Sequence, residues 1–324
     1  MTRRAVIEGA GHYLPDRVVP NSYFESFLNT SDEWIRARSG IERRHFASSS
    51  QTTSDLAFYA AKEAIQNARL NVDDIDGIVV ATSTPDLTFP SVATMVQAKL
   101  EMKTGFGFDV QAVCAGFIFA VANANALIVS GQAERLLVVG SETFSRIMDW
   151  NDRSTCVLFG DGAGAIILAA DEGAGTSDDR GILSTDINSD GSLKDLLYVD
   201  GGVSTSGTSG KLRMQGNLIF RQAVEKLTAT TKQCLKKAGL KEREIDWMVP
   251  HQANLRIINA VANKMGISMD KIVLTIQDHG NTSAASIPLA LSKGIREGKL
   301  KCGDLIVSEA IGGGLAWGSA VMRV

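Results

Sequence analysis

Apolar and polar positions alternate along this chain with two different periods. Apolar residues recur every three to four positions over residues 54–70, which predicts a helix with one buried face. Short apolar runs over 78–82, 106–113 and 135–141 predict buried strands, and a further strand is predicted over 156–170, interrupted by a glycine-rich segment at 160–164. Such strands, alternating with helices, indicate an α/β fold whose mainly parallel or mixed sheets are covered on both faces.

The second part of the chain repeats this order. Helices are predicted over 220–238, 255–265 and 283–297, and strands over 246–250, 272–276 and 304–308. Residues 131–142 match residues 298–309 at an offset of 167, and upstream segments match at an offset of 170. The first offset pairs Cys114 with Asn281, and the second pairs Ala81 with His251. We therefore predict a duplicated fold with halves 1–170 and 171–324 that form one compact unit.

Composition excludes several classes of protein. The 324 residues are 44% hydrophobic and 21% charged, and the net charge of −3 gives no electrostatic footprint for nucleic acid or a membrane surface. Residues 110–133 carry no charge, but their Asn and Ala content fits a buried core helix better than a membrane span. The polar N-terminus and four widely spaced cysteines predict a cytoplasmic protein with reduced thiols. The four histidines do not cluster, so no metal site is expected.

Three residues have candidate chemistry at the ends of predicted elements. Cys114 lies at a strand-to-helix junction, where the helix N-terminus is expected to lower the thiol pKa and favour selective alkylation. His251 follows the strand 246–250, and Asn281 precedes the helix 283–297. Each also has a structural interpretation: core packing for the cysteine, a hydrogen-bonded core residue for the histidine, and a helix N-cap for the asparagine.

Three glycine-rich segments complete the candidate features. Residues 312–314 can bring a backbone N–H group close to a developing oxyanion. Residues 160–164 do not form a dinucleotide-binding motif, and nucleotide binding there is not expected. The Gly/Ser/Thr-rich segment 200–210 fits a surface loop or a mobile flap beside a pocket.

Six motifs, spread over the whole chain, resemble the thiolase superfamily, and specifically the β-ketoacyl-acyl-carrier-protein synthase III family. They are 30–35 (TSDEWI), 113–117 (VCAGF), 159–165 (FGDGAGA), 249–257 (VPHQANLRI), 279–286 (HGNTSAAS) and 312–318 (GGGLAWG). The resemblance implies a five-layer α-β-α-β-α fold with mixed sheets. Asn281, in place of a second histidine, and the absence of cysteine near residue 313 distinguish the chain from elongating synthases and from thiolases.

The resemblance also implies an activity. Cys114, His251 and Asn281 map onto the catalytic triad of an initiating condensing enzyme of fatty acid biosynthesis. Cys114 takes an acyl group, expected to be acetyl, from coenzyme A. Malonyl-acyl carrier protein then loses carbon dioxide and attacks the Cys114 thioester in a Claisen condensation. The N–H groups of Cys114 and Gly313 hold the oxyanion, and no metal or other cofactor is required.

Further residues are assigned by the same resemblance. Trp34, Arg38, Arg153, Gly216 and Asn254 are expected to bind coenzyme A. The expected acyl pocket contains Phe89, Leu197, Leu212, Met214 and Phe220, with Phe89 reaching across a homodimer. Arg256 and Lys264 are expected to contact the carrier protein, although a solvated helix face is the simpler interpretation of these two charges.

Two alternative functions remain open from the sequence. One is a paralogue that primes a polyketide or another secondary pathway, and the other is a non-catalytic acyl-binding scaffold. Gln111, Val113, Trp150 and the segment 200–210 depart from the family pattern, which leaves the acyl-chain preference open.

Overall fold

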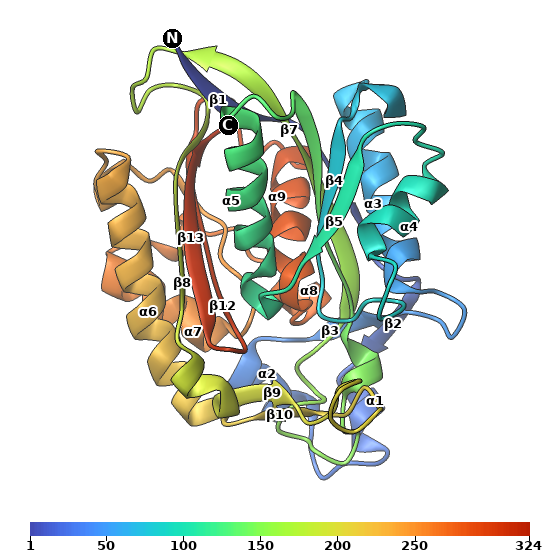
Figure 1. The fold of residues 1–324 in the computed structure, drawn as a ribbon. Helices are drawn as coiled ribbons and strands as arrows, with labels where there is room; N and C mark the ends of the chain where they lie inside the picture. The colour runs from blue at the N-terminus through green and yellow to red at the C-terminus, as the bar shows by residue number, and fades with distance from the viewer.

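Two mixed β-sheets organise residues 1–324, all of which are described by the computed structural model (Figure 1). The first sheet has the order β1-β7-β6-β4-β5, in which β4, β5 and β6 run parallel and β7 and β1 complete it in antiparallel pairings. The second has the order β11-β12-β13-β8, with only β11 and β12 parallel. The prediction of an α/β fold with mixed sheets is therefore confirmed.

Each sheet uses one stretch of the chain. The first sheet consists of β1 (Thr2–Tyr13), β4 (Gly77–Ala81), β5 (Phe106–Val110), β6 (Arg135–Thr143) and β7 (Asp161–Gly173). The second consists of β8 (Gly181–Ser189), β11 (Trp247–Met248), β12 (Leu305–Gly312) and β13 (Ala316–Arg323). Only the last three residues of β7 cross the predicted boundary between the halves at residue 170.

Helices fill three layers around the sheets (Figure 1). The helices α5 (Gly116–Val129) and α9 (Ser286–Arg296) lie between the two sheets and share one buried apolar cluster with both. The helices α3 (Thr53–Ala68) and α4 (Val92–Lys99) cover the outer face of the first sheet, and α6 (Gly216–Lys237) and α7 (Leu255–Met265) cover the second. The five-layer α-β-α-β-α order is thus present.

Local sequence explains these helices. The uncharged α5 is apolar on nearly all sides because it is sandwiched between two sheets, which is the core interpretation of residues 110–133. The helix α3 begins at a capping box formed by Thr52 and Asp55, and only one of its faces is buried. No helix combines the length and apolar character that crossing a membrane would require.

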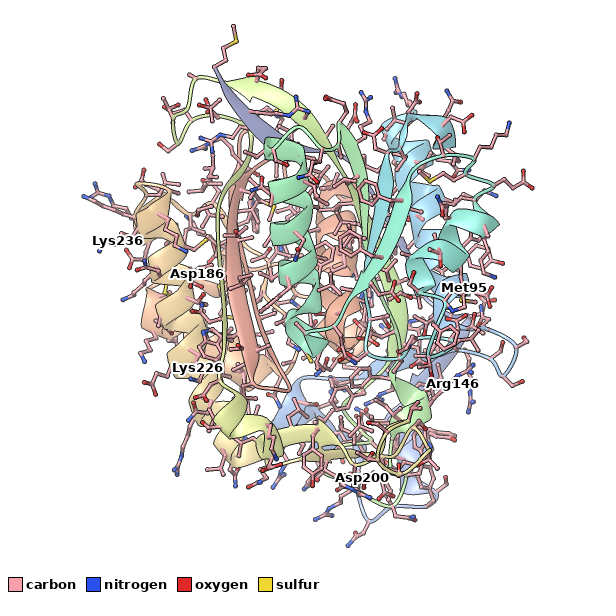
Figure 2. All side chains as sticks on the ribbon, viewed as in Figure 1. Met95, Arg146, Asp186, Asp200, Lys226 and Lys236 are labelled. Atoms are coloured by element: carbon pink, nitrogen blue, oxygen red, sulfur yellow. The ribbon has the colours of Figure 1, made fainter.

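Shorter elements gather at one end of the layers (Figure 1). They are α1 (Ser22–Glu25), α2 (Asp32–Ser39), α8 (Ile276–His279), β2 (Arg17–Pro20), β3 (Arg43–Phe46), β9 (Leu197–Val199) and β10 (Leu212–Met214). The segment 200–210 is the tip of the β9–β10 hairpin, and Asp200 marks it in Figure 2. Arg213 ties the hairpin down through 2.7 Å ion pairs with Asp149 and Asp200.

Two predicted strands differ in the structure. The predicted strand 272–276 is reduced to one bridge between Met248 and Ile272. The side chain of Gln252 accepts hydrogen bonds from the backbone N–H groups of Thr275 and Ile276. These N–H groups therefore bond to a side chain instead of a neighbouring strand, and α8 begins at Ile276. Strand β7 starts at residue 161 instead of 156, and its glycines do not interrupt it. Gly164 instead allows α9 to pack closely, since a Cβ atom there would lie 2.4 Å from the backbone nitrogen of Leu289.

The sheet registers correct one part of the predicted repeat. Gly77 pairs with Leu136 in the first sheet and Trp247 pairs with Ile306 in the second, so both members of the pair are shifted by 170 residues. The short 3₁₀ helices η2 (Val113–Ala115) and η7 (Ser283–Ala285) keep the same spacing. Their first residues even share a rare positive φ, 49° at Val113 and 50° at Ser283.

The predicted equivalence of Cys114 with Asn281 is therefore wrong. The offset of 167 comes from segments that follow α5 and α9, and α5 has 14 residues whereas α9 has 11. Residues before the two helices are therefore shifted by three more positions. The true counterpart of Cys114 is Ala284, whereas the pairing of His251 with Ala81 agrees with the sheet register.

Candidate active site

Cys114, His251 and Asn281 line one cavity of about 610 Å³. Cys114 lies in η2, between β5 and α5. His251 follows β11 and donates its backbone N–H to the Glu309 carbonyl oxygen at 2.8 Å. Asn281 is fixed beside Phe159 by backbone hydrogen bonds to Leu158 and Gly160, both of 2.9 Å. All three side chains are nearly buried, so the two halves bring the predicted triad to one enclosed place.

Hydrogen bonds around His251 define which ring nitrogen carries the proton. The Ser286 hydroxyl oxygen accepts a hydrogen bond from the Gln252 backbone N–H at 3.3 Å and lies 2.6 Å from His251 Nδ1. His251 Nδ1 is the only acceptor for the hydroxyl proton of Ser286. Nδ1 is therefore the acceptor, and Nε2 carries the hydrogen. Burial lowers the pKa of His251 to about 3, so the ring is neutral, and Nε2 has no partner in the chain. The ring presents one free N–H donor.

The Asn281 side chain supplies a second donor. Its Oδ1 accepts the backbone N–H of Ser283 at 2.9 Å, which fixes the orientation of the amide. The amide Nδ2 makes no hydrogen bond within the chain. An amide cannot act as a base near neutral pH, so Asn281 can only donate. Two N–H donors with no partner inside the chain are suited to an oxygen that becomes negatively charged during a reaction.

The Cys114 thiol does not have the predicted low pKa. Burial, and to a smaller extent the charge of Glu142, raise the pKa of Cys114 to about 12, although a hydrogen bond with Ser283 opposes this rise. The cysteine lies in the 3₁₀ helix η2, before the first turn of α5, and it is buried. Selective alkylation at neutral pH is therefore no longer expected, because Cys302 is exposed while Cys114 is buried.

A glycine keeps the space in front of the Cys114 backbone open. A Cβ atom on Gly312 would lie 2.6 Å from the Cys114 nitrogen. In the other half, the position shifted by 170 residues is Glu142, whose carboxylate accepts hydrogen bonds from the Ser283 hydroxyl and the Ala284 backbone N–H. The Glu142 carboxylate thus occupies the start of η7. At the start of η2 the equivalent residue is Gly312, which has no side chain, so a negatively charged oxygen of a substrate has space there.

The cavity also includes most of the residues predicted to bind substrates. These are Trp34, Arg38, Gly216 and Asn254 from the coenzyme A set, Leu197, Met214 and Phe220 from the acyl set, and Arg256 from the docking set. The guanidinium groups of Arg38 and Arg153 lie 4.4 and 4.9 Å from the centre of the Trp34 ring. A purine can replace either partner on this indole.

Five predicted residues do not line the cavity. Arg153 lies beside it through its contact with Trp34, and Leu212 is buried in the β9–β10 hairpin opposite Val199. Phe89 is 82% exposed, outside the cavity of its own chain. Gly313 packs against Leu197, and a Cβ atom there would lie 2.6 Å from the Leu197 carbonyl oxygen. Lys264 is exposed on α7, two turns from Arg256.

Sequence reasoning missed the residues that orient the triad. Ser283 and Ser286 contact its members, Glu142 bonds to Ser283, and Arg221 and Asn217 line the cavity. Both serines stand in the motif 279–286, in which the resemblance assigns a role only to Asn281. A buried strand that ends in a glutamate at residue 142 was the available signal, since a buried carboxylate requires partners.

Comparisons with known proteins agree with this geometry. Two family models match, one described as 3-Oxoacyl-[acyl-carrier-protein (ACP)] synthase III over residues 108–191 and one described as the C-terminal part of that enzyme over residues 235–324. The chain is 69% identical to the beta-ketoacyl-[acyl-carrier-protein] synthase III of Ruegeria sp. (strain TM1040), with 100% of both chains covered.

Solved structures give the same result. The crystal structure of 3-oxoacyl-[acyl-carrier-protein] synthase III from Aquifex aeolicus VF5 is 46% identical, covers 99% of this chain and 100% of its own, and has a TM-score of 0.93. The priming β-ketosynthase of the R1128 polyketide pathway also has a TM-score of 0.93 but is only 31% identical, with 100% of this chain and 97% of its own covered. The polyketide-priming alternative is therefore not favoured, and the chain belongs to the 3-oxoacyl-[acyl-carrier-protein] synthase III family.

Proposed function

We propose that this chain starts fatty acid synthesis by joining an acyl group from coenzyme A to malonyl-acyl carrier protein. The observation that carries the proposal is the meeting of a buried thiol with two unpartnered N–H donors in one cavity. A thiol can hold an acyl group as a thioester. The donors at His251 and Asn281 can stabilise an enolate oxygen, which is the charge that decarboxylation of a malonyl thioester creates.

The proposed reaction has two stages, acyl transfer to Cys114 and decarboxylative condensation. In the first, the Cys114 sulfur attacks the thioester carbon of acyl-CoA, the oxyanion lies in the space left by Gly312, and CoA departs as its thiolate. In the second, the malonyl carboxylate leaves as carbon dioxide and its electrons form the enolate. The enolate carbon attacks the Cys114 thioester, which releases the cysteine and yields 3-oxoacyl-acyl carrier protein. Decarboxylation itself supplies the carbanion, so the chemistry requires no metal or redox cofactor.

Charged and aromatic residues at the cavity mouth suit the two carriers. The indole of Trp34 with its two guanidinium neighbours can stack on the adenine of coenzyme A and bind its phosphates. Gly216 and Asn254 line the path toward Cys114, where the narrow pantetheine arm would lie. Arg256 and Lys264 lie on the exposed side of α7 and suit an acidic carrier protein.

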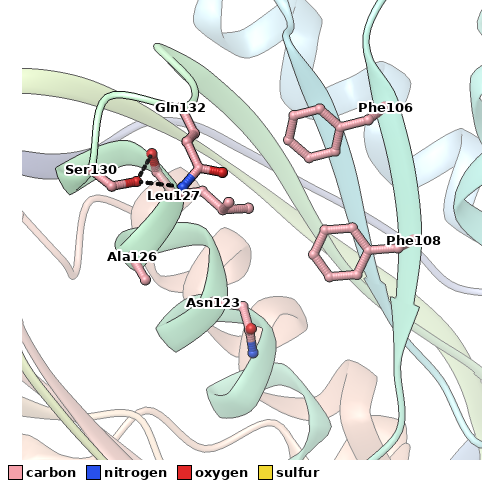
Figure 3. A pocket seen from close by; sticks show the side chains of 7 residues that line it. All are labelled: Phe106, Phe108, Asn123, Ala126, Leu127, Ser130 and Gln132. Carbon is pink, nitrogen blue, oxygen red and sulfur yellow. Dashed lines mark hydrogen bonds between the residues drawn. The ribbon is translucent and has the colours of Figure 1, made fainter.

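A homodimer is part of this proposal. Strand β5 is the edge of the first sheet and leaves its outer backbone groups unpaired. Figure 3 shows Phe106 and Phe108 of β5 pointing across a groove toward Leu127 of α5. A second copy that pairs along β5 would cover this groove, and the exposed Phe89 would then be available to the partner's acyl pocket. The cytoplasmic location also remains a proposal, in keeping with four free thiols.

Mass spectrometry of the protein after incubation with a panel of acyl-CoAs tests the function. We expect one acyl group per chain on the peptide that contains Cys114, with acetyl-CoA among the substrates, and no acyl group on a Cys114→Ser variant. Loading on another cysteine, or the absence of any loading, would contradict the proposal. The panel also reveals which acyl chains fit the cavity.

A further inference from the structure

The remaining question at the site is what removes the proton from Cys114. The thiol is nearly buried and has a pKa of about 12, so water is a poor acceptor for its proton. His251 is a poor base as well, because its Nε2 already carries a hydrogen and its Nδ1 is bonded to Ser286. The site therefore requires another group that can accept this proton.

Ser283 and Glu142 provide a path for it. The Ser283 hydroxyl donates a hydrogen bond to Glu142 Oε1 at 3.2 Å, and its oxygen is left to accept one from its other partner, the Cys114 thiol. Glu142 is completely buried near the end of β6. Ser283 is the first residue of η7 and has a positive φ of 50°, a strained backbone conformation for a serine. A single hydroxyl thus stands between the thiol and a carboxylate.

We propose that Ser283 and Glu142 form a proton relay that generates the Cys114 thiolate. The S–H bond of Cys114 breaks and its proton passes to the Ser283 oxygen, while the Ser283 proton passes to Glu142 and forms a carboxylic acid. The site keeps one negative charge throughout, which moves from the carboxylate to the sulfur. When condensation releases Cys114 as a thiolate, the same path returns the proton.

The surroundings of Glu142 fit a carboxyl that exchanges its proton. Burial raises its pKa to about 7, although hydrogen bonds from Thr84, the Ser83 backbone and Ser283 oppose this shift. These neighbours come from the segment after β4 and from η7, and none of them titrates near neutral pH. Cys114 in η2 is the titratable group that faces the carboxyl, and no basic side chain bonds to it. A carboxyl with a pKa near neutrality is matched to general base catalysis.

The pH dependence of Cys114 alkylation by iodoacetamide, followed on its own peptide, tests the relay. The relay makes the reactive form, thiolate plus protonated Glu142, a constant fraction once the pair has lost one proton, because repulsion between two buried anions keeps the doubly ionised form scarce. The wild-type rate should therefore level off between about pH 7.5 and 9. In Glu142→Gln, the proton must go to solvent, and the rate should rise roughly tenfold per pH unit over this range.

Glu309→Gln is the matched control, because Glu309 is a second buried glutamate with a raised pKa whose side chain makes no hydrogen bond to Ser283. This control should keep the wild-type plateau. A plateau in Glu142→Gln, or a wild-type rate that rises tenfold per pH unit, would overturn the proposal. A merely structural role of Glu142 would change the rate at every pH without changing the slope.

The inference rests on the proposed function, but the two can fail separately. Alkylation requires no acyl-CoA, so a protein that shows the plateau and yet loads no acyl group would contradict only the proposed function. We also expect acetyl loading from acetyl-CoA at pH 7 to fall at least tenfold in Glu142→Gln, in line with the loss of a general base. If Glu142→Gln fails to fold, the slope of the wild-type alkylation rate and a loss of acetyl loading in Ser283→Ala decide the question.

Discussion

Replacing Gly312 by alanine should block the acyl transfer step while leaving the thiol reactive. The added Cβ atom would lie 2.6 Å from the Cys114 nitrogen and 2.8 Å from the Ala112 carbonyl oxygen. Contacts of Cβ atoms below 3.0 Å are essentially never observed, and both neighbours are backbone atoms that cannot swing aside. The methyl group would therefore occupy the space in front of the Cys114 N–H group, where the oxyanion is expected.

The magnitude follows from two effects. Loss of one oxyanion donor typically lowers a catalytic rate by about 10²–10³-fold, or roughly 3–4 kcal/mol. Overpacking of a buried site typically destabilises the fold by about 1–3 kcal/mol. We therefore expect acetyl transfer from acetyl-CoA to Cys114 to fall at least 100-fold, roughly the lower limit for a lost donor, and the melting temperature to fall by several degrees.

A single-turnover measurement of acetyl transfer, together with alkylation of Cys114 by iodoacetamide, separates these effects. Alkylation forms no oxyanion and should change by less than about threefold, because the thiol remains in place. Gly191→Ala is the control, since a Cβ atom there has no neighbour within 4 Å. Acetyl transfer that survives in Gly312→Ala, or that is lost equally in Gly191→Ala, would refute the assignment of the oxyanion site.

Three further changes test other parts of the account. Asn281→Ala should keep acetyl loading of Cys114 but lower malonyl decarboxylation at least 100-fold, roughly as expected for one lost donor; a variant that fails at loading would contradict the donor role. Arg256→Ala should raise the KM for malonyl-acyl carrier protein severalfold with little change for acetyl-CoA, whereas Lys236→Ala, at the far end of α6 (Figure 2), should change neither. Burial raises the pKa of Glu309 to about 8, so the folded state retains a proton that the unfolded chain loses above its ordinary value of 4.5. Stability should therefore fall as the pH rises from 4.5 to 8, by at most about 1.4 kcal/mol per pH unit. Glu309→Gln should remove that slope in thermal unfolding, and an unchanged slope would show that Glu309 is ionised in the fold.

Periodicity and position along the chain predicted much of this architecture. The uncharged stretch after Cys114 was interpreted as a buried central helix, and α5 between two sheets has that environment. His251 was placed at the end of a parallel strand, where ligands collect in α/β sheets, and it lies on the cavity. These features follow from local pattern, because a helix apolar on all sides and a polar residue after a buried strand each have few structural explanations.

The repeat showed where local pattern fails. The match between residues 131–142 and 298–309 includes a Ser-Glu pair in both copies, yet the sheet register shifts these strands by 170 residues and not by 167. A sequence match across a helix cannot reveal that the helix in one copy is three residues shorter. The register depends on which residues face each other in the sheet, and that is a tertiary property.

The thiol of Cys114 illustrates a second limit. Its position before a helix suggested a lowered pKa, but the pKa depends on how far the sulfur is from water and on the charge of Glu142. Neither is visible in the sequence around residue 114, because Glu142 and Ser283 come from distant segments. Folding brings Glu142 and Ser283 within hydrogen-bond distance, so the relay can be recognised only in the folded chain.

The central claim is that one acyl group passes through Cys114 and leaves by decarboxylative condensation. A single-turnover chase tests it most directly: the protein is loaded with acetyl-CoA, freed of excess substrate and mixed with malonyl-acyl carrier protein, and the Cys114 peptide and the carrier protein are followed by mass spectrometry. The acetyl group should disappear from Cys114 at the rate at which 3-oxobutyryl-acyl carrier protein forms, with one carbon dioxide released per chain. Acetyl that stays on Cys114 while the product forms, or that is lost only by hydrolysis, would contradict the account.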